Sequence, residues 1–232
     1  MNLFYTHPDD VQLPEITIRD QEALHIAKVL RYKKGDILHI TDGLGNLYQG
    51  IIQEIRKSVV EVSLLDNRSE KRGDPYISLC IGNIKNRDRL EFAVEKATEL
   101  GVDRIIIFQG DHSQKGNIRK DRIESTVLAA MKQSLRVFLP DIIVEESLVD
   151  LLHHLKKEDK LLMADETSDA VGEIQQDGDS LFLVVGPEGG FSKNEREILK
   201  KAGAIRVSLG TKRLRTETAA IIMTERYKNS QS

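Results

Sequence analysis

Short apolar runs alternate with segments whose apolar residues recur at helical spacing from residue 76 onwards. The runs predict strands buried on both faces, which is typical of parallel sheets. They cover residues 77–81, 104–108, 161–163, 181–185 and 205–209. Helices are expected near residues 90–100, 119–138, 148–157 and 193–202, with a last helix after Thr216. Alternation of this kind predicts an α/β fold with a parallel sheet.

The first seventy residues carry a different, mostly β pattern. Strands are expected at residues 3–5, 16–18, 37–41, 47–54 and 59–65, and one helix from about Asp20, as its N-cap, to about Tyr32. Three consecutive antiparallel strands with turn signals between them indicate a small barrel. Polar residues 67–74 end before Pro75 and predict a linker. We therefore expect two domains, residues 1–72 and residues 75–232.

The composition is that of an ordinary soluble globular protein, with 40% hydrophobic and 31% charged residues. No apolar stretch reaches the length of a membrane span, and no signal-peptide pattern opens the chain. The single cysteine, Cys80, lies in an apolar run, so we expect a core residue and not a nucleophile. Together these features predict a reducing, cytoplasmic environment.

Charge is unevenly distributed along a chain whose net charge is only −3. Residues 145–179 contain eleven acids and three lysines, whereas residues 206–215 contain four cations and no acid. A second cationic stretch covers residues 115–136. A basic face on an acidic molecule is compatible with RNA binding, although charge runs are more often plain solvated surface.

Two glycine-bearing turns follow the apolar runs near the end of the chain. The first, Gly186–Phe191, leads into Ser192 and Glu195, which have capping-box spacing; the second is Ser208–Gly210. We expect both turns side by side at one edge of the sheet, where open α/β sheets bind ligands. Neither matches a Walker loop or a dinucleotide-binding loop. A tight turn that needs glycine for geometry alone remains the alternative, and the arginines beside the second turn favour a site.

The segments GPEGGFS at 186–192 and LRTETA at 214–219 resemble the ribosomal RNA uridine-N3 methyltransferases of the SPOUT superfamily. The resemblance is nearly end to end. Further matches are His25 with 29–31, Gly35–Asp36, Asp42–Gly43, Gly45, Lys85, Arg89, Glu91, 96–102 and Gln133–Ser134. It implies a homodimer that uses S-adenosylmethionine to methylate a uracil in small-subunit ribosomal RNA, within the assembled subunit. It also implies a deep trefoil knot in the catalytic domain, preceded by a small PUA- or OB-like β-barrel.

The chain departs from this family's pattern in three places. Residues 210–213 read Gly-Thr-Lys-Arg, where the family more often has a proline, an arginine and an apolar residue. Leu135 follows Gln133–Ser134 where a glycine is usual. The N-terminus lacks an early arginine that many members carry, so RNA contacts assigned to that arginine do not transfer.

Methylation at uracil N3 requires loss of the N3 proton and stabilisation of the resulting anion, whose charge spreads onto two carbonyl oxygens. A guanidinium beside those oxygens supplies this stabilisation, and Arg215 is our candidate. Glu217 or Glu188 is the candidate base. An ion pair between Arg215 and Glu217 that caps the last helix is the alternative. For Glu188 the alternative, and the one we favour, is acceptance of backbone amides within its loop.

The resemblance also implies a cofactor held by main-chain groups of three loops. The cofactor residues are Met163, Ala164, Gly186, Pro187, Glu188, Gly189, Gly190, Ser208, Leu209, Gly210 and Leu214. Residues such as Met163 and Leu214 are more often plain core residues than adenine contacts. The RNA-binding candidates are His25, Lys28, Arg31, Lys85, Arg89, Gln133, Ser134, Arg136, Lys212 and Arg213. No His/Cys cluster has metal-ligand spacing, so we expect no metal site.

Three other functions remain open at this stage. A SPOUT relative could act on another target, such as a ribose 2′-oxygen or transfer RNA. An RNA-binding assembly factor could keep the fold without catalysis, although intact Arg215 and Glu217 argue against it. A phosphate-binding α/β hydrolase is disfavoured because the Walker lysine and serine are missing.

Overall fold

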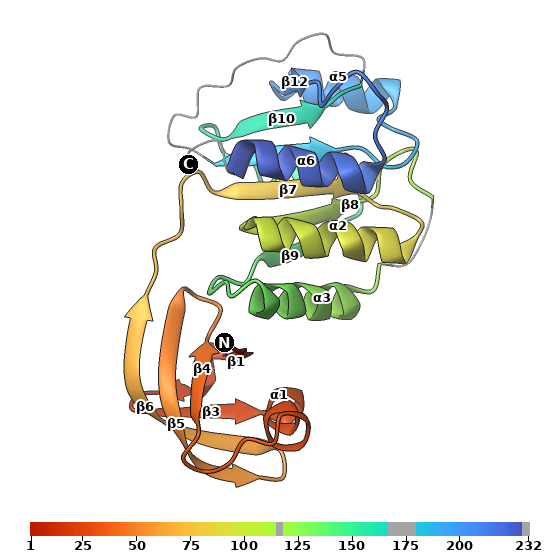
Figure 1. The fold of residues 1–232 in the computed structure, drawn as a ribbon. Helices are drawn as coiled ribbons and strands as arrows, with labels where there is room; N and C mark the ends of the chain where they lie inside the picture. The colour runs from red at the N-terminus through yellow and green to blue at the C-terminus, as the bar shows by residue number, and fades with distance from the viewer. Residues whose placement is uncertain (115–117, 167–179, 229–232) are drawn as a thin grey trace. The chain divides into compact units, whose positions relative to one another are not determined.

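The computed structural model describes residues 1–114, 118–166 and 180–228 (Figure 1). The chain divides into two compact units. The first comprises Met1–Arg72 with Leu128–Leu139, and the second comprises Gly73–Val127 with Pro140–Ser232. The passage from Arg72 to Gly73 falls within the polar segment expected to be a linker.

The first unit is built on a six-stranded sheet with the order β1-β4-β5-β6-β3-β2. Only the β1–β4 pair is parallel. Its strands are β1 Leu3–Tyr5, β2 Val11–Gln12, β3 Glu15–Arg19, β4 Ile37–Thr41, β5 Asn46–Arg56 and β6 Val59–Ser69. Ile18, Ile26, Leu38 and Val60 pack in a core of their own. The paired strands form one linear order, and the closed barrel stays a prediction.

The helical part of this unit differs from the predicted single helix over 20–32. The 3-10 turn η1 covers Pro8–Asp10, α1 covers Asp20–Leu24, and a π-helical turn, η2, continues from His25 to Val29. Arg19, not Asp20, is the N-cap, and Asp20 itself has a φ of 53°. The Leu30 amide donates to the His25 carbonyl, five residues back, which widens the turn. The helix ends before Tyr32 because Arg31 adopts a φ of 58° that a right-handed helix does not allow.

The second unit contains a sheet with the order β12-β10-β11-β7-β8-β9, in which every neighbouring pair is parallel. Its strands are β7 Ile77–Gly82, β8 Arg104–Phe108, β9 Asp141–Glu145, β10 Lys160–Ala164, β11 Leu181–Val185 and β12 Ile205–Val207. β7 and β11 are buried on both faces, as their apolar runs predict. The sequence pattern missed β9, because this half-exposed edge strand lacks a continuous buried run.

Helices cover both faces of this sheet (Figure 1). They are α2 Arg87–Leu100, α3 Lys120–Gln133, α4 Leu148–Leu152, α5 Lys193–Lys201 and α6 Thr216–Lys228. α2 and α6 pack against each other, and α6 contacts β7 and β11. Leu148 and Leu151 of α4 and Leu199 of α5 pack on the face that carries Cys80 and Phe182. α3 ends before the predicted 138, because Leu135 adopts a φ of 57° that a right-handed helix does not allow.

Strand order decides where a ligand can bind. From β7 the chain proceeds through β8 to β9 on one side, whereas β11, β10 and β12 lie on the other side. The carboxyl ends of β7 and β11 therefore flank the topological switch point. The two glycine turns do reach the same edge of the sheet. The strands that carry them, β11 and β12, are separated by β10.

Candidate active site

A cavity of about 660 Å³ opens at the carboxyl ends of β7, β10, β11 and β12. Four segments form its wall, one after each of these strands. They contribute Asn86 and Arg89; Ala164, Asp165 and Glu166; Val185–Glu188, Gly190, Phe191 and Arg196; and Leu209, Gly210, Lys212–Thr216 and Ala219. All of these residues belong to the second unit.

The glycine loop, Gly186–Gly190, bends tightly at the end of β11. The amide of Gly190 donates to the Pro187 carbonyl at 2.8 Å, and Gly190 has a φ of 70°. Gly82, at the end of β7, lies so close that a Cβ there would collide with the backbone of Gly186 and Pro187. Backbone-to-backbone contact of this kind needs glycine. The loop is therefore held against the end of β7.

The predicted capping box at the start of α5 is present. The Glu195 amide donates to the Ser192 hydroxyl at 3.1 Å, and the Ser192 amide donates to the Glu195 carboxylate at 2.7 Å. The other oxygen of Glu195 accepts from the Asp111 amide at 3.1 Å. Sequence reasoning missed this second role, because Asp111 comes from the distant loop after β8. The near-complete burial of Glu195 reveals this second role, because a capping acid that served only its own helix would be more exposed.

The loop after β8 supports the glycine loop from behind. The Ser192 hydroxyl donates to Asp111 at 2.5 Å. His112 Nδ1 lies 3.1 Å from the carbonyl oxygens of both Gly189 and Gly190. Gly189 thus faces His112 and not the cavity, although we expected it among the cofactor residues. The contacts of Asp111 and His112 therefore hold the glycine loop in place from outside the cavity.

Arg89 joins the glycine loop to the last helix. Its Nε and Nη2 donate to the two carboxylate oxygens of Glu217 at 2.8 and 2.6 Å, and its Nη1 donates to Glu188. The Arg89 side chain is 26% exposed and that of Glu217 is 9% exposed. Burial raises the pKa of Glu217, but the hydrogen bonds from Arg89 and nearby positive charge outweigh it and hold the pKa below its ordinary value.

This arrangement bears on the predicted catalytic residues. Arg215 and Glu188 line the cavity, whereas Glu217 stands behind Arg89 and does not. Glu217 accepts two hydrogen bonds from the Arg89 side chain, whereas Arg215 acts on it only through its charge. The alternative of an Arg215–Glu217 cap is thus replaced by an ion pair between α2 and α6, because the packing of these helices brings Arg89 closer.

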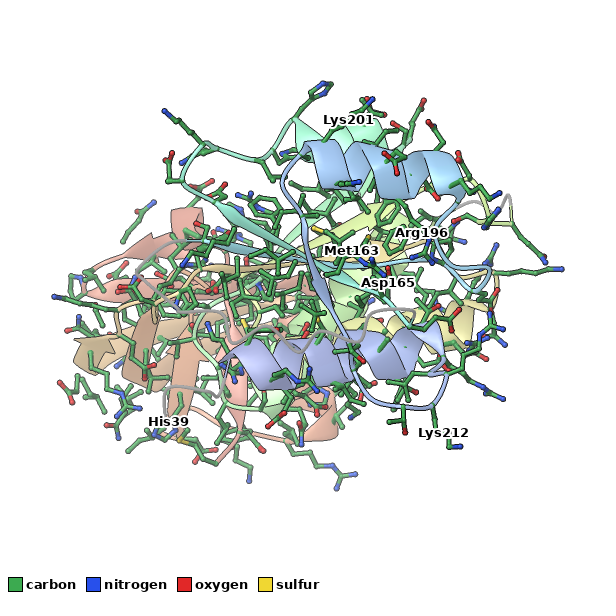
Figure 2. All side chains as sticks on the ribbon, turned by 90° about the horizontal axis from the view of Figure 1, so that it is seen from above. His39, Met163, Asp165, Arg196, Lys201 and Lys212 are labelled. Carbon is green, nitrogen blue, oxygen red and sulfur yellow. The ribbon has the colours of Figure 1, made fainter. Side chains whose placement is uncertain are left out.

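Asp165 is the buried anion of the cavity wall. Its carboxylate accepts from Arg196 of α5 at 2.7 Å and from Arg206 of β12 at 2.9 Å, and its side chain is 1% exposed. Figure 2 shows Arg196 beside Asp165. Two guanidinium groups compensate the cost of burying this charge. Part of the basic stretch at 206–215 therefore serves an internal ion pair.

The remaining predicted residues fall into three groups. Ala164, Gly186, Pro187, Gly190, Leu209, Gly210, Leu214, Lys212 and Arg213 line the cavity, as does Arg89. Met163 is buried in the core beneath the cavity, Ser208 adjoins it without lining it, and Lys85 lines a small cleft beside Arg119. His25, Lys28, Arg31, Gln133, Ser134 and Arg136 belong to the first unit. Asn86, Asp165, Glu166, Val185, Phe191, Arg196, Thr216 and Ala219 also line the cavity and were not among the named candidates.

Within the described ranges, no group of three or more His, Cys, Asp or Glu side chains is arranged to hold a metal ion. Cys80 is fully buried, and burial raises the pKa of its thiol well above the ordinary value. This environment fits the predicted core role. Among the described helices, none combines the length and apolar character needed to cross a membrane.

A parallel sheet with a glycine-walled cavity at its switch point defines an α/β domain of the enzyme type. Residues 72–228 match the model of the RNA methyltransferase domain, and residues 18–65 match that of the RNA methyltransferase PUA domain. The chain belongs to the RNA methyltransferase family, with a PUA domain at its N-terminal end. The resemblance expected from the two C-terminal motifs is confirmed.

Relatives with names of the same kind agree with this assignment. The chain is 29% identical to ribosomal RNA small subunit methyltransferase E of Bacillus subtilis, over 90% of this chain and 88% of the relative. It is 30% identical to the protein of the same name in Rickettsia conorii, over 95% and 92%. The S-adenosylmethionine-bound crystal structure of ribosomal RNA small subunit methyltransferase E from Neisseria gonorrhoeae superimposes with a TM-score of 0.87 at 25% identity, covering 97% and 95%.

Proposed function

We propose that this protein transfers a methyl group from S-adenosylmethionine to uracil N3 of a uridine in small-subunit ribosomal RNA. The family and the names of its relatives support the cofactor and the class of RNA. The choice of N3 as the methylated atom rests on the resemblance of the two C-terminal motifs to those of the uridine-N3 methyltransferases. The observation that carries the proposal is one cavity containing both the glycine loop and Arg215.

The cavity fits a bent nucleoside cofactor. Gly190 and Gly210 have φ angles of 70° and 139°, and the space where a Cβ would stand is open at both. Main-chain groups of the glycine loop and of Leu209–Gly210 can therefore approach an adenine ring closely, as the resemblance implies. Leu214 and Ala164 would form apolar contacts. S-adenosylmethionine supplies an electrophilic methyl group on a sulfonium.

The chain's own residues have to place uracil and accept its proton. A new bond joins N3 to the methyl carbon while the sulfur–carbon bond breaks, and the N3 proton leaves for a carboxylate or for water. Arg215 would stabilise the charge that develops on the uracil oxygens. Of the two predicted bases, Glu188 is the better placed because it lines the cavity. Glu217 is the weaker candidate, since its lowered pKa makes it a poorer proton acceptor.

RNA binding would use cations at the cavity and on the PUA-containing unit. Lys212 and Arg213 are exposed and line the cavity. His25, Lys28 and Arg31 are exposed around the π-helical turn, and π-turns often occur at functional sites. Lys85 adds an exposed cation in the second unit. Gln133, Ser134 and Arg136, in the first unit, complete the set of proposed RNA contacts. Contacts of this kind to phosphates position RNA without reading its sequence.

The resemblance extends the proposal to the whole particle. We expect a homodimer, a trefoil knot in the second unit, a closed small barrel in the first, and action on the assembled small subunit in the cytoplasm. Light scattering at a mass near twice 26.2 kDa would support the dimer. A crystal structure whose chain path does not thread a loop would contradict the knot.

The test is mass spectrometry of ribosomal RNA from cells that lack this protein. We expect one 3-methyluridine of the small subunit to disappear. The wild type and Lys201→Ala, an exposed cation on α5, should restore it, whereas Arg215→Ala should not. Unchanged methylation in the deleted strain would refute the proposal.

Two outcomes distinguish the competing functions. Loss of a ribose methyl group, or of a methyl group in transfer RNA, would identify another target for the same site. Tight cofactor binding by the purified protein without transfer to any ribosomal particle would identify an assembly factor. Either result would overturn the N3 assignment.

A further inference from the structure

Arg89 lies in the cavity wall, yet all three of its guanidinium nitrogens are directed at protein carboxylates. Nε and Nη2 bind Glu217 in a two-pronged arrangement at 2.8 and 2.6 Å, and Nη1 binds Glu188. Arg89 comes from the first turn of α2, Glu188 from the glycine loop and Glu217 from the first turn of α6. A single side chain therefore connects three of the segments that surround the cavity.

The two carboxylates depend on this cation. Glu188 and Glu217 both lie within hydrogen-bonding distance of one guanidinium, so their negative charges are close together. Without Arg89 they would repel each other, and the largely buried Glu217 would lose its main compensation. The fork shape of the guanidinium suits this task, because a lysine ammonium cannot make the same planar two-pronged contact.

Connecting Glu217 also fixes Arg215. Arg215 precedes Glu217 by two residues, and its carbonyl accepts from the Ala219 amide at 2.8 Å in the first turn of α6. Holding the start of this helix against the glycine loop therefore sets the distance between the loop and the Arg215 backbone. A methyl-transfer site needs such a fixed separation, since donor and acceptor must be aligned within a fraction of an ångström.

We propose that Arg89 is a positioning residue that clamps the glycine loop to the start of α6, with Glu188 and Glu217 as the two ends of the clamp. This inference builds on the proposed function and adds a role to it. It reassigns Arg89 from RNA binding, makes Glu217 a structural anchor of the site, and gives Glu188 an anchoring role in addition to that of candidate base. Arg89 acts through Glu188 and Arg215 and takes no part in bond making.

The test uses the full-length protein, calorimetric binding of S-adenosylmethionine, and methyl transfer to small ribosomal subunits. Arg89→Ala should lower cofactor affinity and kcat by about ten- to a hundredfold, as expected for a site displaced by about an ångström. Arg89→Lys should recover only part of the loss, because it restores the charge and not the fork. Millimolar guanidinium, below denaturing concentrations, should partly rescue Arg89→Ala and leave Arg89→Lys unchanged.

The pH profile provides a readout that loss of packing alone would not change. In the described part of the chain, three charged groups surround Glu217. They are Arg89 of α2, Glu188 of the glycine loop, and Arg215, which precedes Glu217 in its own segment. Removing Arg89 leaves burial as the main influence on Glu217, so its pKa should rise above the wild-type value. In the wild type, protonation of Glu217 breaks the clamp and should lower kcat at acidic pH, whereas Arg89→Ala lacks the clamp at every pH and should lose this acidic limb.

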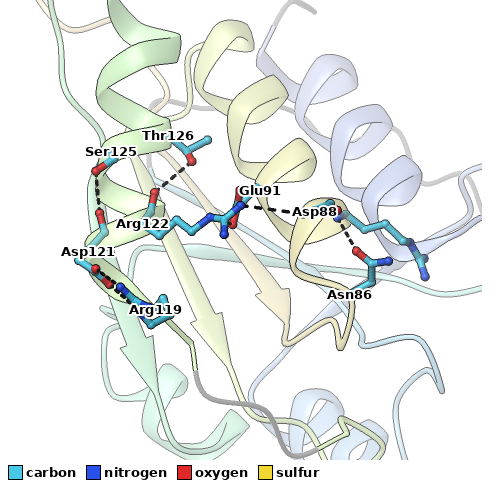
Figure 3. A network of polar contacts seen from close by, with 9 residues as sticks. Asn86, Asp88, Glu91, Arg119, Asp121, Arg122, Ser125 and Thr126 are labelled. Carbon is cyan, nitrogen blue, oxygen red and sulfur yellow. Dashed lines mark hydrogen bonds and ion pairs between the residues drawn. The ribbon is translucent and has the colours of Figure 1, made fainter.

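Arg122→Ala is the matched control. Arg122 of α3 binds Glu91 of α2 at 2.6 Å, so it is also a guanidinium bridge to α2, but neither partner lines the main cavity (Figure 3). Its removal should leave cofactor affinity and the pH profile unchanged. Equal losses in Arg122→Ala and Arg89→Ala would overturn the inference, because they would show that any weakening of α2 has the same effect.

The outcomes separate this inference from the proposed function. Wild-type protein that neither binds cofactor nor methylates small subunits would refute the function. Active wild type together with fully active Arg89→Ala would refute only the clamp. Should circular dichroism show that Arg89→Ala is unfolded, Glu188→Gln decides. It removes one charged end of the clamp and should reduce cofactor affinity severalfold with the fold intact, and unchanged affinity would overturn the inference.

Discussion

Gly82 illustrates how a single residue decides the shape of the cavity. It is the last residue of β7, and a Cβ at this position would lie within 3 Å of backbone atoms of Gly186 and Pro187. A glycine inside a strand often marks such a close approach of another backbone. The sequence alone does not mark Gly82, since nothing around it in β7 signals contact with a loop about a hundred residues away.

Gly82→Ala should push the glycine loop away from β7. The added methyl group meets rigid backbone, so we expect a destabilisation of about 1–3 kcal/mol and weaker cofactor binding. Urea denaturation and calorimetry measure the two effects. Gly73→Ala is the control, because a Cβ at Gly73 has no neighbour within 4 Å. Equal behaviour of the two variants would contradict the importance of the contact.

At the scale of elements, the start of α5 connects two loops and a helix. Glu195 is 3% exposed and accepts from the Ser192 amide inside its own helix cap and from the Asp111 amide in the loop after β8. A capping acid normally satisfies only its own helix end. Here it also fixes the support behind the glycine loop, so helix capping and site geometry depend on the same carboxylate.

Glu195→Ala should therefore cost more stability than Ser192→Ala. Ser192→Ala should cost about 1 kcal/mol for the cap, and its exposed hydrogen bond to Asp111 adds little because water replaces it. Loss of Glu195 leaves two amides without their acceptor, each worth roughly 1–3 kcal/mol when buried. Differential scanning calorimetry of the two variants gives the comparison, and an equal or smaller loss for Glu195→Ala would show that the Asp111 contact contributes nothing.

At the scale of the whole molecule, each unit has its own core and the cavity belongs entirely to the second unit. A ligand that binds only the folded state raises the free energy of unfolding by about 2.7 kcal/mol at a hundred times its Kd. This stabilisation should be confined to the second unit, which contains the cavity. The PUA-containing unit has no share in the cavity wall.

We expect S-adenosylmethionine to raise the unfolding temperature and to protect amides around Ala164–Glu166, Gly186–Phe191 and Leu209–Thr216. Hydrogen exchange followed by mass spectrometry locates this protection. Gly210→Val should abolish both effects, because valine at a φ of 139° is strained and its side chain would alter the adenine-facing loop. Protection centred on residues 1–72 would contradict the assignment of the cofactor site.

Local patterns in the sequence determined the elements and much of the cavity wall. The apolar runs at 104–108 and 181–185 match β8 and β11 residue for residue, and the capping box starts α5 where expected. These features depend on neighbours within a few positions, so the sequence records them directly. The glycine turns, Arg215 and Glu188 belong to the same local signals.

Tertiary structure decided which of these pieces meet. Sheet order placed β10 between β11 and β12 and so brought buried Asp165 into the wall. Helix packing pairs Glu217 with Arg89, which lies 128 residues away in the chain, and not with nearby Arg215. Such partners are selected by how sheets and helices pack over long sequence separations. No periodicity or motif in one chain encodes that choice locally.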